Sequence, residues 1–258
     1  MGSGRLTAGA VDVVHRPRLT HTSPVVVYLH SAASDATESN GVSLPDVQPV
    51  ITRIVNAGFT VVAATQPVAS WASGTTGDNT TAMGRVQDAI TYARNTLGCT
   101  NAKVVLMGTS MGSALALRYA ALNPTLVASV VTWLTITDLS TARYQNLGTN
   151  AAGISTAYGI PNDGTTARGG TPLPANSDPA TMTAALSAVP MMLHHSSDDA
   201  YWTTGIGNAG AGTPCGDNFM SLVGANATAV NVGALGHTTA SIAATDKEAV
   251  VAFIQAHP

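Results

Sequence analysis

The sequence predicts one α/β domain in which a mostly parallel sheet is covered by helices on both faces. Short runs of β-branched residues alternate with segments of helical periodicity, an order typical of consecutive strand–helix units. Most of the β runs are almost continuously apolar, as strands buried on both sides are. The length of 258 residues fits one such domain better than two, so we expect a single domain over residues 1–258.

Seven segments are predicted as strands because they are short, apolar and rich in valine and other β-formers. In chain order they are 11–15, 25–29, 59–64, 104–107, 127–133, 189–193 and 228–232. Four segments are predicted as helices because their apolar residues recur at helical spacing and their ends carry recognisable stop signals. These are 46–57, which stops at Gly58, 80–97, which stops at Gly98, 111–122, which is closed by Asn123-Pro124, and 245–256.

One long segment does not follow this alternation. Residues 139–187 are rich in glycine, threonine, proline and asparagine, show weak periodicity, and are too many for an ordinary connection. We therefore predict an insertion between the strands near 127–133 and 189–193, either a cap that helps to bind substrate or a surface loop.

Composition excludes several classes of protein. Only 10% of the residues are charged, against roughly 25% in typical soluble chains. The 11 basic residues are scattered and balanced by 14 acidic ones, so we expect no nucleic-acid partner. Apolar residues make up 45% of the chain, which argues against disorder, but no apolar run approaches the length of a membrane span.

The cysteines and the N-terminus leave the cellular compartment open. Cys99 and Cys215 can form one disulfide or none, and neither lies in a metal-binding pattern. The first five residues lack the apolar core of a secretory signal. We expect a cytoplasmic protein, a released or virion-associated one, or a chain from which a leader has been removed.

The strongest local motif is Gly108-Thr109-Ser110-Met111-Gly112, a G-x-S-x-G sequence. It directly follows the predicted strand 104–107 and opens the predicted helix 111–122, the strand–turn–helix context of a nucleophilic serine. The turn is so tight that a Cβ atom at either glycine position would collide with neighbouring backbone. The helix N-terminus at the serine also favours developing negative charge.

With this motif in place, the chain resembles the α/β-hydrolase family over essentially its whole length. In that family an acid and then a histidine follow the serine in chain order. The predicted strand 189–193 is followed by His194-His195-Ser196-Ser197-Asp198-Asp199, similar to the family's acid segment. On this alignment Asp198 is the acid, Asp199 is the near alternative, and Asp138, after strand 127–133, is a third candidate. His237 ends a small-residue loop after the last strand and is the predicted base.

The resemblance also implies an oxyanion hole, two backbone N–H groups that stabilise the negatively charged oxygen of the reaction intermediate. One donor is expected from Met111, directly after the serine. The other is expected from Ala32, with Ser31 as the alternative, in the loop after strand 25–29. His30 is expected to be structural.

Three aromatic residues are candidates for substrate binding. Trp71, Tyr201 and Trp202 are predicted at the rim of the site, where they would line an acyl or aromatic pocket. The adjacent pair His194-His195 is not expected to bind metal, because neighbouring residues at a strand end point to opposite sides.

The sequence thus indicates a serine esterase that cleaves carboxylic esters through an acyl-serine intermediate, with a Ser110-His237-Asp198 triad and no cofactor or metal. The expected substrate is a small-molecule or polymer ester, since the family includes lipases, polyester-degrading esterases and cell-wall esterases. One alternative is a peptidase or amidase of the same fold. The other is a non-catalytic module of this fold used for binding or as a structural part of a larger particle, such as a phage virion.

Overall fold

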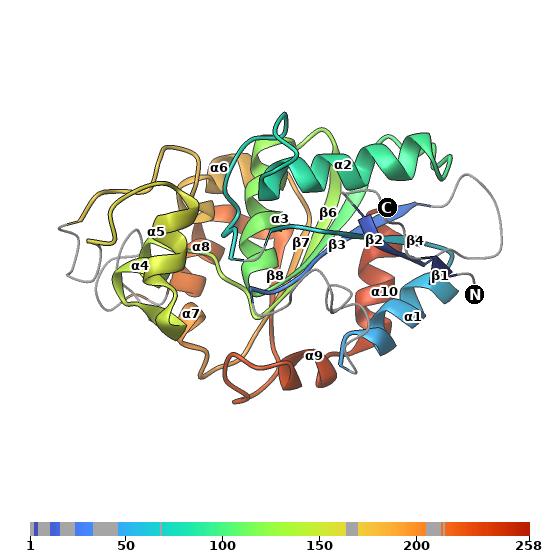
Figure 1. Ribbon diagram of the computed structural model, residues 1–258. Helices are drawn as coiled ribbons and strands as arrows, with labels where there is room; N and C mark the ends of the chain where they lie inside the picture. Colours follow the sequence, from blue (N-terminus) through green and yellow to red (C-terminus); the bar gives the residue numbers. More distant parts are fainter. Residues whose placement is uncertain are drawn as a thin grey trace.

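The computed structural model describes residues 3–4, 11–15, 24–32, 46–67, 69–163, 170–204, 213 and 215–258. Its centre is an eight-stranded sheet with the order β1-β2-β4-β3-β5-β6-β7-β8 (Figure 1). The six strands from β4 to β8 in that order are parallel, and β1 and β2 pair antiparallel at one edge. The strands are β1 (Ser3–Gly4), β2 (Val11–His15), β3 (Val25–Leu29), β4 (Thr60–Ala64), β5 (Val104–Thr109), β6 (Val127–Trp133), β7 (Met191–His195) and β8 (Ala227–Asn231).

The predicted fold class is confirmed, and every predicted strand is present within two residues of its expected position. β1 was not predicted, since two residues carry no periodicity. The strand predicted at 189–193 is displaced: β7 runs over 191–195, so the turn that follows it begins two residues later than expected. Asp198 and Asp199, the two neighbouring candidates for the acid, lie in this turn, so the displacement bears on the choice between them.

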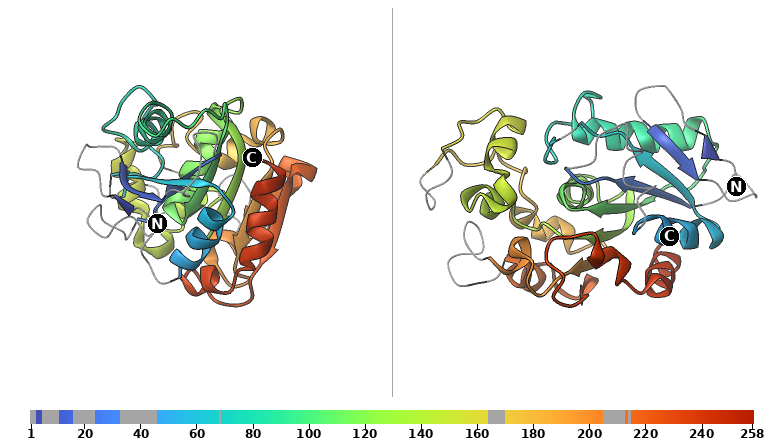
Figure 2. Two further views of the ribbon diagram at one scale, coloured as in Figure 1. Left: turned by 90° about the vertical axis from the view of Figure 1, so that its right-hand side faces the viewer. Right: turned by 60° about the horizontal axis from the view of Figure 1, so that its bottom comes forward.

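Helices cover both faces of the sheet, because alternate strand residues are apolar on each side. Val25 and Val27 belong to the core under α2, α3, α6 and α8, whereas Val26 belongs to the core under α1 and α10. Figure 2 shows α1 and α10 side by side, in blue and red. The α-helices are α1 (Gln48–Asn56), α2 (Ala82–Asn95), α3 (Met111–Leu122), α4 (Leu139–Tyr144), α5 (Ala151–Ala157), α6 (Thr183–Leu186), α7 (Ala200–Thr203), α8 (Cys215–Val223), α9 (Ala240–Ala243) and α10 (Lys247–Ala256).

Residues 139–187, between β6 and β7, contain α4, α5, α6 and the 3-10 turns η2 (Leu147–Thr149) and η3 (Pro179–Thr181). Figure 1 shows α4 and α5 together beyond one end of the sheet. The buried Arg143 guanidinium holds this segment together by donating to Ser155 Oγ at 2.8 Å, to two carbonyl oxygens, and to Asp163 Oδ1 at 2.7 Å. Such a hub replaces a continuous apolar stripe, which explains the weak periodicity of the sequence here.

Cys99 and Cys215 are both buried, and neither is part of a disulfide, so the structure has the second of the two alternatives left open by the sequence. Within the described ranges, no helix is both long and apolar enough to cross a membrane.

Candidate active site

The carboxyl ends of the parallel strands meet at one edge of the sheet, and the predicted nucleophile lies there. Ser110 directly follows β5 and precedes α3, with φ 53° and ψ −117°. A positive φ is strained for a residue with a side chain and is typical of functional turns. The Ser110 N–H donates to Trp133 O at 3.0 Å, which ties the turn to β6.

Two close backbone approaches explain the glycines that flank this turn. A Cβ atom on Gly108 would lie 2.2 Å from Gly112 O, and one on Gly112 would lie 2.2 Å from Leu29 O. The predicted steric reason for the G-x-S-x-G motif is therefore present in the structure. The second contact also shows that α3 begins against the end of β3.

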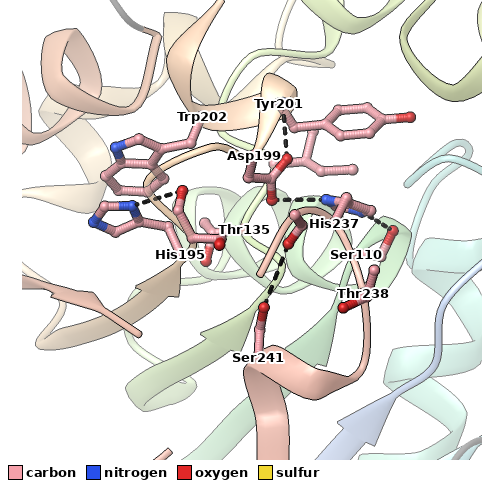
Figure 3. A network of polar contacts seen from close by, with 12 residues as sticks. Ser110, Thr135, His195, Asp199, Tyr201, Trp202, His237, Thr238 and Ser241 are labelled. Atoms are coloured by element: carbon pink, nitrogen blue, oxygen red, sulfur yellow. Dashed lines mark hydrogen bonds and ion pairs between the residues drawn. The ribbon is translucent and has the colours of Figure 1, made fainter. Parts of the chain in front are cut away.

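Ser110, His237 and Asp199 form a continuous hydrogen-bonded chain (Figure 3). Ser110 Oγ lies 2.8 Å from His237 Nε2, and His237 Nδ1 lies 2.8 Å from Asp199 Oδ2. A carboxylate can only accept, so His237 Nδ1 donates to Asp199 and Nε2 is left to accept the Ser110 proton. Asp199 is fully buried, and its second oxygen, Oδ1, accepts from Tyr201 N at 2.9 Å. Two donors thus fix the plane of the carboxylate.

The prediction that Asp198 contacts His237 is wrong by one residue, because Asp199 makes that contact. Asp198 is exposed, and its Oδ1 accepts from Gly236 N at 2.7 Å and from Ser196 Oγ. These bonds lower the pKa of the Asp198 carboxyl. Because β7 extends to His195, Asp199 becomes the N-cap of α7 and faces the histidine. That N-cap position, directly before a short helical run, is the sequence signal that favours Asp199.

The third acid candidate, Asp138, lies elsewhere. It is buried, and its Oδ1 accepts from Thr141 N at 2.7 Å as the N-cap of α4. Burial, followed by the nearby charge of Asp178, raises the pKa of Asp138 to about 7.

The two proposed oxyanion donors lie in one region. The Met111 N–H is the first of α3, where backbone donors have no partner within the helix. Ala32 packs against the side-chain cluster that contains Met111. The loop that carries Ala32 is anchored by His30, whose Nε2 lies 3.1 Å from Gln66 O and whose Nδ1 lies 2.8 Å from Ser31 O. His30 is therefore buried and structural in its contacts, as expected.

Of the three aromatic candidates, only Tyr201 contacts the hydrogen-bonded chain. Its ring centroid lies 4.3 Å from that of His237, and its hydroxyl donates to Leu147 O at 2.7 Å. Trp202 points away, stacked on His195 with centroids 4.0 Å apart, in the core under α8 (Figure 3). Its expected place at the rim is wrong, because α7 turns successive side chains to different sides.

Trp71 is also not at the surface: its side chain is 1% exposed and packs with Met111 and Tyr201. Its neighbours Ala69 and Ser70 instead line an uncharged groove of about 340 Å³ between the 67–81 loop and α5. Ala69 and Ala157 line this groove and also pack on the Met111 cluster, so the groove adjoins the candidate site.

The adjacent histidines point to opposite sides, as expected. His194 stacks on Trp133 and its Nδ1 lies 2.9 Å from Thr132 O, whereas His195 stacks on Trp202. Burial lowers the pKa of His194 to about 4. Among the described residues, no group of three or more histidines, cysteines and acids could hold a metal ion.

Two serines that support the site were not identified from the sequence. Ser113 Oγ donates to Ser110 O and accepts from Ile136 N at 2.9 Å, which links the nucleophile turn to the loop after β6. Ser196 is fully buried beneath the loop that carries His237, and its Oγ accepts from Leu235 N at 2.6 Å. Serine is too common in loops for either position to give a signal.

The family model for the alpha/beta hydrolase fold matches residues 24–242. The chain therefore belongs to the α/β hydrolase fold family, and the resemblance inferred from the sequence is confirmed. No curated protein is detectably similar in sequence.

Solved structures share the fold at low identity. MPT51 (FbpC1) of Mycobacterium tuberculosis is similar with a TM-score of 0.68 and 15% identity, over 98% of this chain and 99% of that one. The fluorophosphonate-binding serine hydrolase FphF of Staphylococcus aureus has a TM-score of 0.66 and 13% identity, over 98% and 97%. Carboxyl esterase 2 of Tuber melanosporum has a TM-score of 0.64 and 15% identity, over 99% and 86%. These similarities establish the fold alone.

Proposed function

We propose that this protein is a serine hydrolase that cleaves carboxylic esters through an acyl-serine intermediate. The observation that carries the proposal is the chain of two 2.8 Å contacts that joins Ser110, His237 and Asp199. A serine hydroxyl is a weak nucleophile at neutral pH and needs a base to accept its proton as it attacks. His237 Nε2, 2.8 Å from Ser110 Oγ, is the base that we propose for this step.

In the first half of the reaction, Ser110 Oγ attacks the ester carbonyl carbon while its proton passes to His237 Nε2. Asp199 stabilises the resulting imidazolium through Nδ1–H. The Met111 and Ala32 N–H groups are the proposed donors to the oxyanion. Collapse of the tetrahedral intermediate breaks the ester C–O bond, and the His237 proton passes to the departing alcohol. Water, activated by the same histidine, then releases the acid and restores Ser110.

We further propose that residues 139–187 form a cap-like insertion within a single domain over 1–258. Tyr201 connects this segment to His237, since its ring packs on the imidazole while its hydroxyl bonds to Leu147 O and Asn150 Nδ2. The groove between the 67–81 loop and α5 is the proposed subsite for the part of the substrate remote from the ester bond. Its lining carries no charged residue, which favours an uncharged substrate.

The direct test is a series of p-nitrophenyl esters of increasing acyl length, assayed beside a peptide p-nitroanilide. We expect ester hydrolysis that Ser110→Ala abolishes. Faster cleavage of the anilide than of any ester would instead identify an amidase. Folded protein that cleaves neither would favour a non-catalytic module.

The groove is tested by Ala157→Trp, which fills it, with Ala152→Trp as the matched control. Ala152 lies on the same helix but is exposed and outside the groove lining. We expect Ala157→Trp to lower kcat/KM for long acyl esters while acetate is unaffected. Equal rates for all esters in both variants would contradict the subsite.

A further inference from the structure

The loop that carries His237 is held from below by two side chains of the preceding strand–helix turn. Gly236 N donates to Asp198 Oδ1 at 2.7 Å, and Leu235 N donates to Ser196 Oγ at 2.6 Å. The single Ser196 hydroxyl proton goes either to Asp198 Oδ1, at 2.8 Å, or to Gly233 O, at 2.6 Å. Two consecutive N–H groups of the loop thus end on the Ser196–Asp198 pair.

Packing does little to fix this loop. Gly233 and Ala234 are exposed, and a Cβ atom on Gly233 would meet nothing within 4 Å. Further hydrogen bonds hold the ends of the loop. Ser197 N donates to Gly233 O, and Gly233 N donates to Asn231 Oδ1. Thr238 Oγ1 donates to Leu235 O, and Ser241 Oγ makes a long contact of 3.4 Å with Gly236 O. Hydrogen bonds rather than apolar contacts therefore determine where the loop lies.

We propose that Asp198, supported by Ser196, is a positioning residue: it holds the 233–236 loop so that His237 Nε2 stays within reach of Ser110. This inference rests on the proposed function. The two adjacent aspartates then have separate tasks, because Asp199 orients the imidazole and Asp198 orients the backbone that carries it. A displacement of about 1 Å in a reacting group can cost roughly 100-fold in rate, so a loosened loop is expected to lower kcat.

The test compares Asp198→Ala with Asp198→Asn in p-nitrophenyl acetate hydrolysis. The alanine variant loses the acceptor for Gly236 N–H, and we expect kcat to fall about 10- to 100-fold with KM changed less than about threefold. The asparagine variant keeps a carbonyl oxygen at that place but removes the charge, and it should recover most of the lost kcat. An asparagine variant as slow as the alanine variant would overturn the proposal, because the charge and not the bond would then matter. Wild-type kcat in Asp198→Ala would overturn it too.

Ser196→Ala supplies a second, independent variant, and it replaces Asp198→Ala in the comparison if that protein does not fold. In a double-mutant cycle, the two alanine substitutions should lower kcat by less than the product of their separate effects, because they act on one loop. Fully multiplicative effects would contradict a shared role.

Amide hydrogen exchange of residues 232–237, measured by mass spectrometry, gives a readout that does not need catalysis. We expect faster exchange in Asp198→Ala and Ser196→Ala than in the wild type and Asp198→Asn. If wild-type protein hydrolyses no ester, the proposed function fails, while exchange still shows whether the loop is held. If wild-type protein is active but exchange and kcat are the same in all variants, only the present inference fails.

Discussion

Asp199 Oδ2 accepts a 2.8 Å hydrogen bond from His237 Nδ1, while the adjacent Asp198 bonds to Gly236 N in the loop that leads to the histidine. Asp199 is fully buried and Asp198 is exposed. A buried carboxylate with two fixed donors is a better partner for an imidazolium than one in contact with water, where the charge interaction is screened.

Asp199→Asn is expected to lower kcat roughly 10³- to 10⁴-fold, because the amide no longer holds the histidine in the tautomer that accepts the Ser110 proton. The measurement is p-nitrophenyl acetate hydrolysis at neutral pH. Asp138→Asn is the matched control, since Asp138 caps α4 and does not contact His237. Full activity in Asp199→Asn would contradict the assignment of the acid.

Gly112→Ala tests the steric account of the nucleophile turn. The added Cβ would lie 2.2 Å from Leu29 O and 2.7 Å from His30 O, both backbone atoms, so α3 or β3 has to shift. We expect the free energy of unfolding to fall by roughly 3 kcal/mol. Gly77→Ala is the control, because nothing lies within 4 Å of a Cβ atom there. Equal melting temperatures of the two variants would contradict the account.

The buried pair Asp138 and Asp178 predicts a pH dependence of stability. The folded-state pKa of Asp138, about 7, lies above its ordinary value of 3.8. Between these two pH values the folded protein therefore keeps a proton on Asp138 that the unfolded chain has released. Stability from this group is therefore fully present below pH 3.8 and is lost as the pH rises toward and through 7.

Asp138→Asn mimics the protonated acid at every pH. We expect it to become more stable relative to the wild type as the pH rises from 4 to 8, by up to roughly 4 kcal/mol. Urea unfolding at pH 4.5, 6 and 8 measures the difference. A constant difference across this range would show that Asp138 is not held protonated.

Substitutions of Tyr201 distinguish two roles of this residue: positioning of His237, and the substrate contact that the sequence predicts. Tyr201→Ala removes the ring that packs on His237, and we expect kcat to fall about 10-fold or more with a small change in KM. Tyr201→Phe keeps the ring and loses two hydrogen bonds, at a cost of about 1 kcal/mol each in stability. A large rise in KM with unchanged kcat would instead indicate direct substrate binding.

The sequence predicts the sheet and the nucleophile turn well because both depend on local physics. Buried parallel strands need continuous apolar residues, and the Gly108 and Gly112 contacts are imposed by one tight turn. Residues 139–187 are harder, because Arg143 organises them through bonds to residues 12 to 28 positions away. Hydrogen bonds of that kind leave no periodic pattern.

The error in the predicted acid has its cause in the length of β7. The expected strand stops at Leu193, but pairing with β8 continues through His195. The turn after β7 therefore begins at Ser196, and Asp199 rather than Asp198 is the N-cap of α7 and bonds to His237. Trp202 lies in the core for a separate reason, since α7 turns successive side chains to different sides.

Labelling with a fluorophosphonate probe tests the central claim most directly, because such a probe reacts only with an activated serine. We expect the wild-type protein to be labelled at Ser110, as located by peptide mass spectrometry, and folded Ser110→Ala to remain unlabelled. Folded wild-type protein that does not react, or Ser110→Ala that reacts at the wild-type rate, would contradict the account.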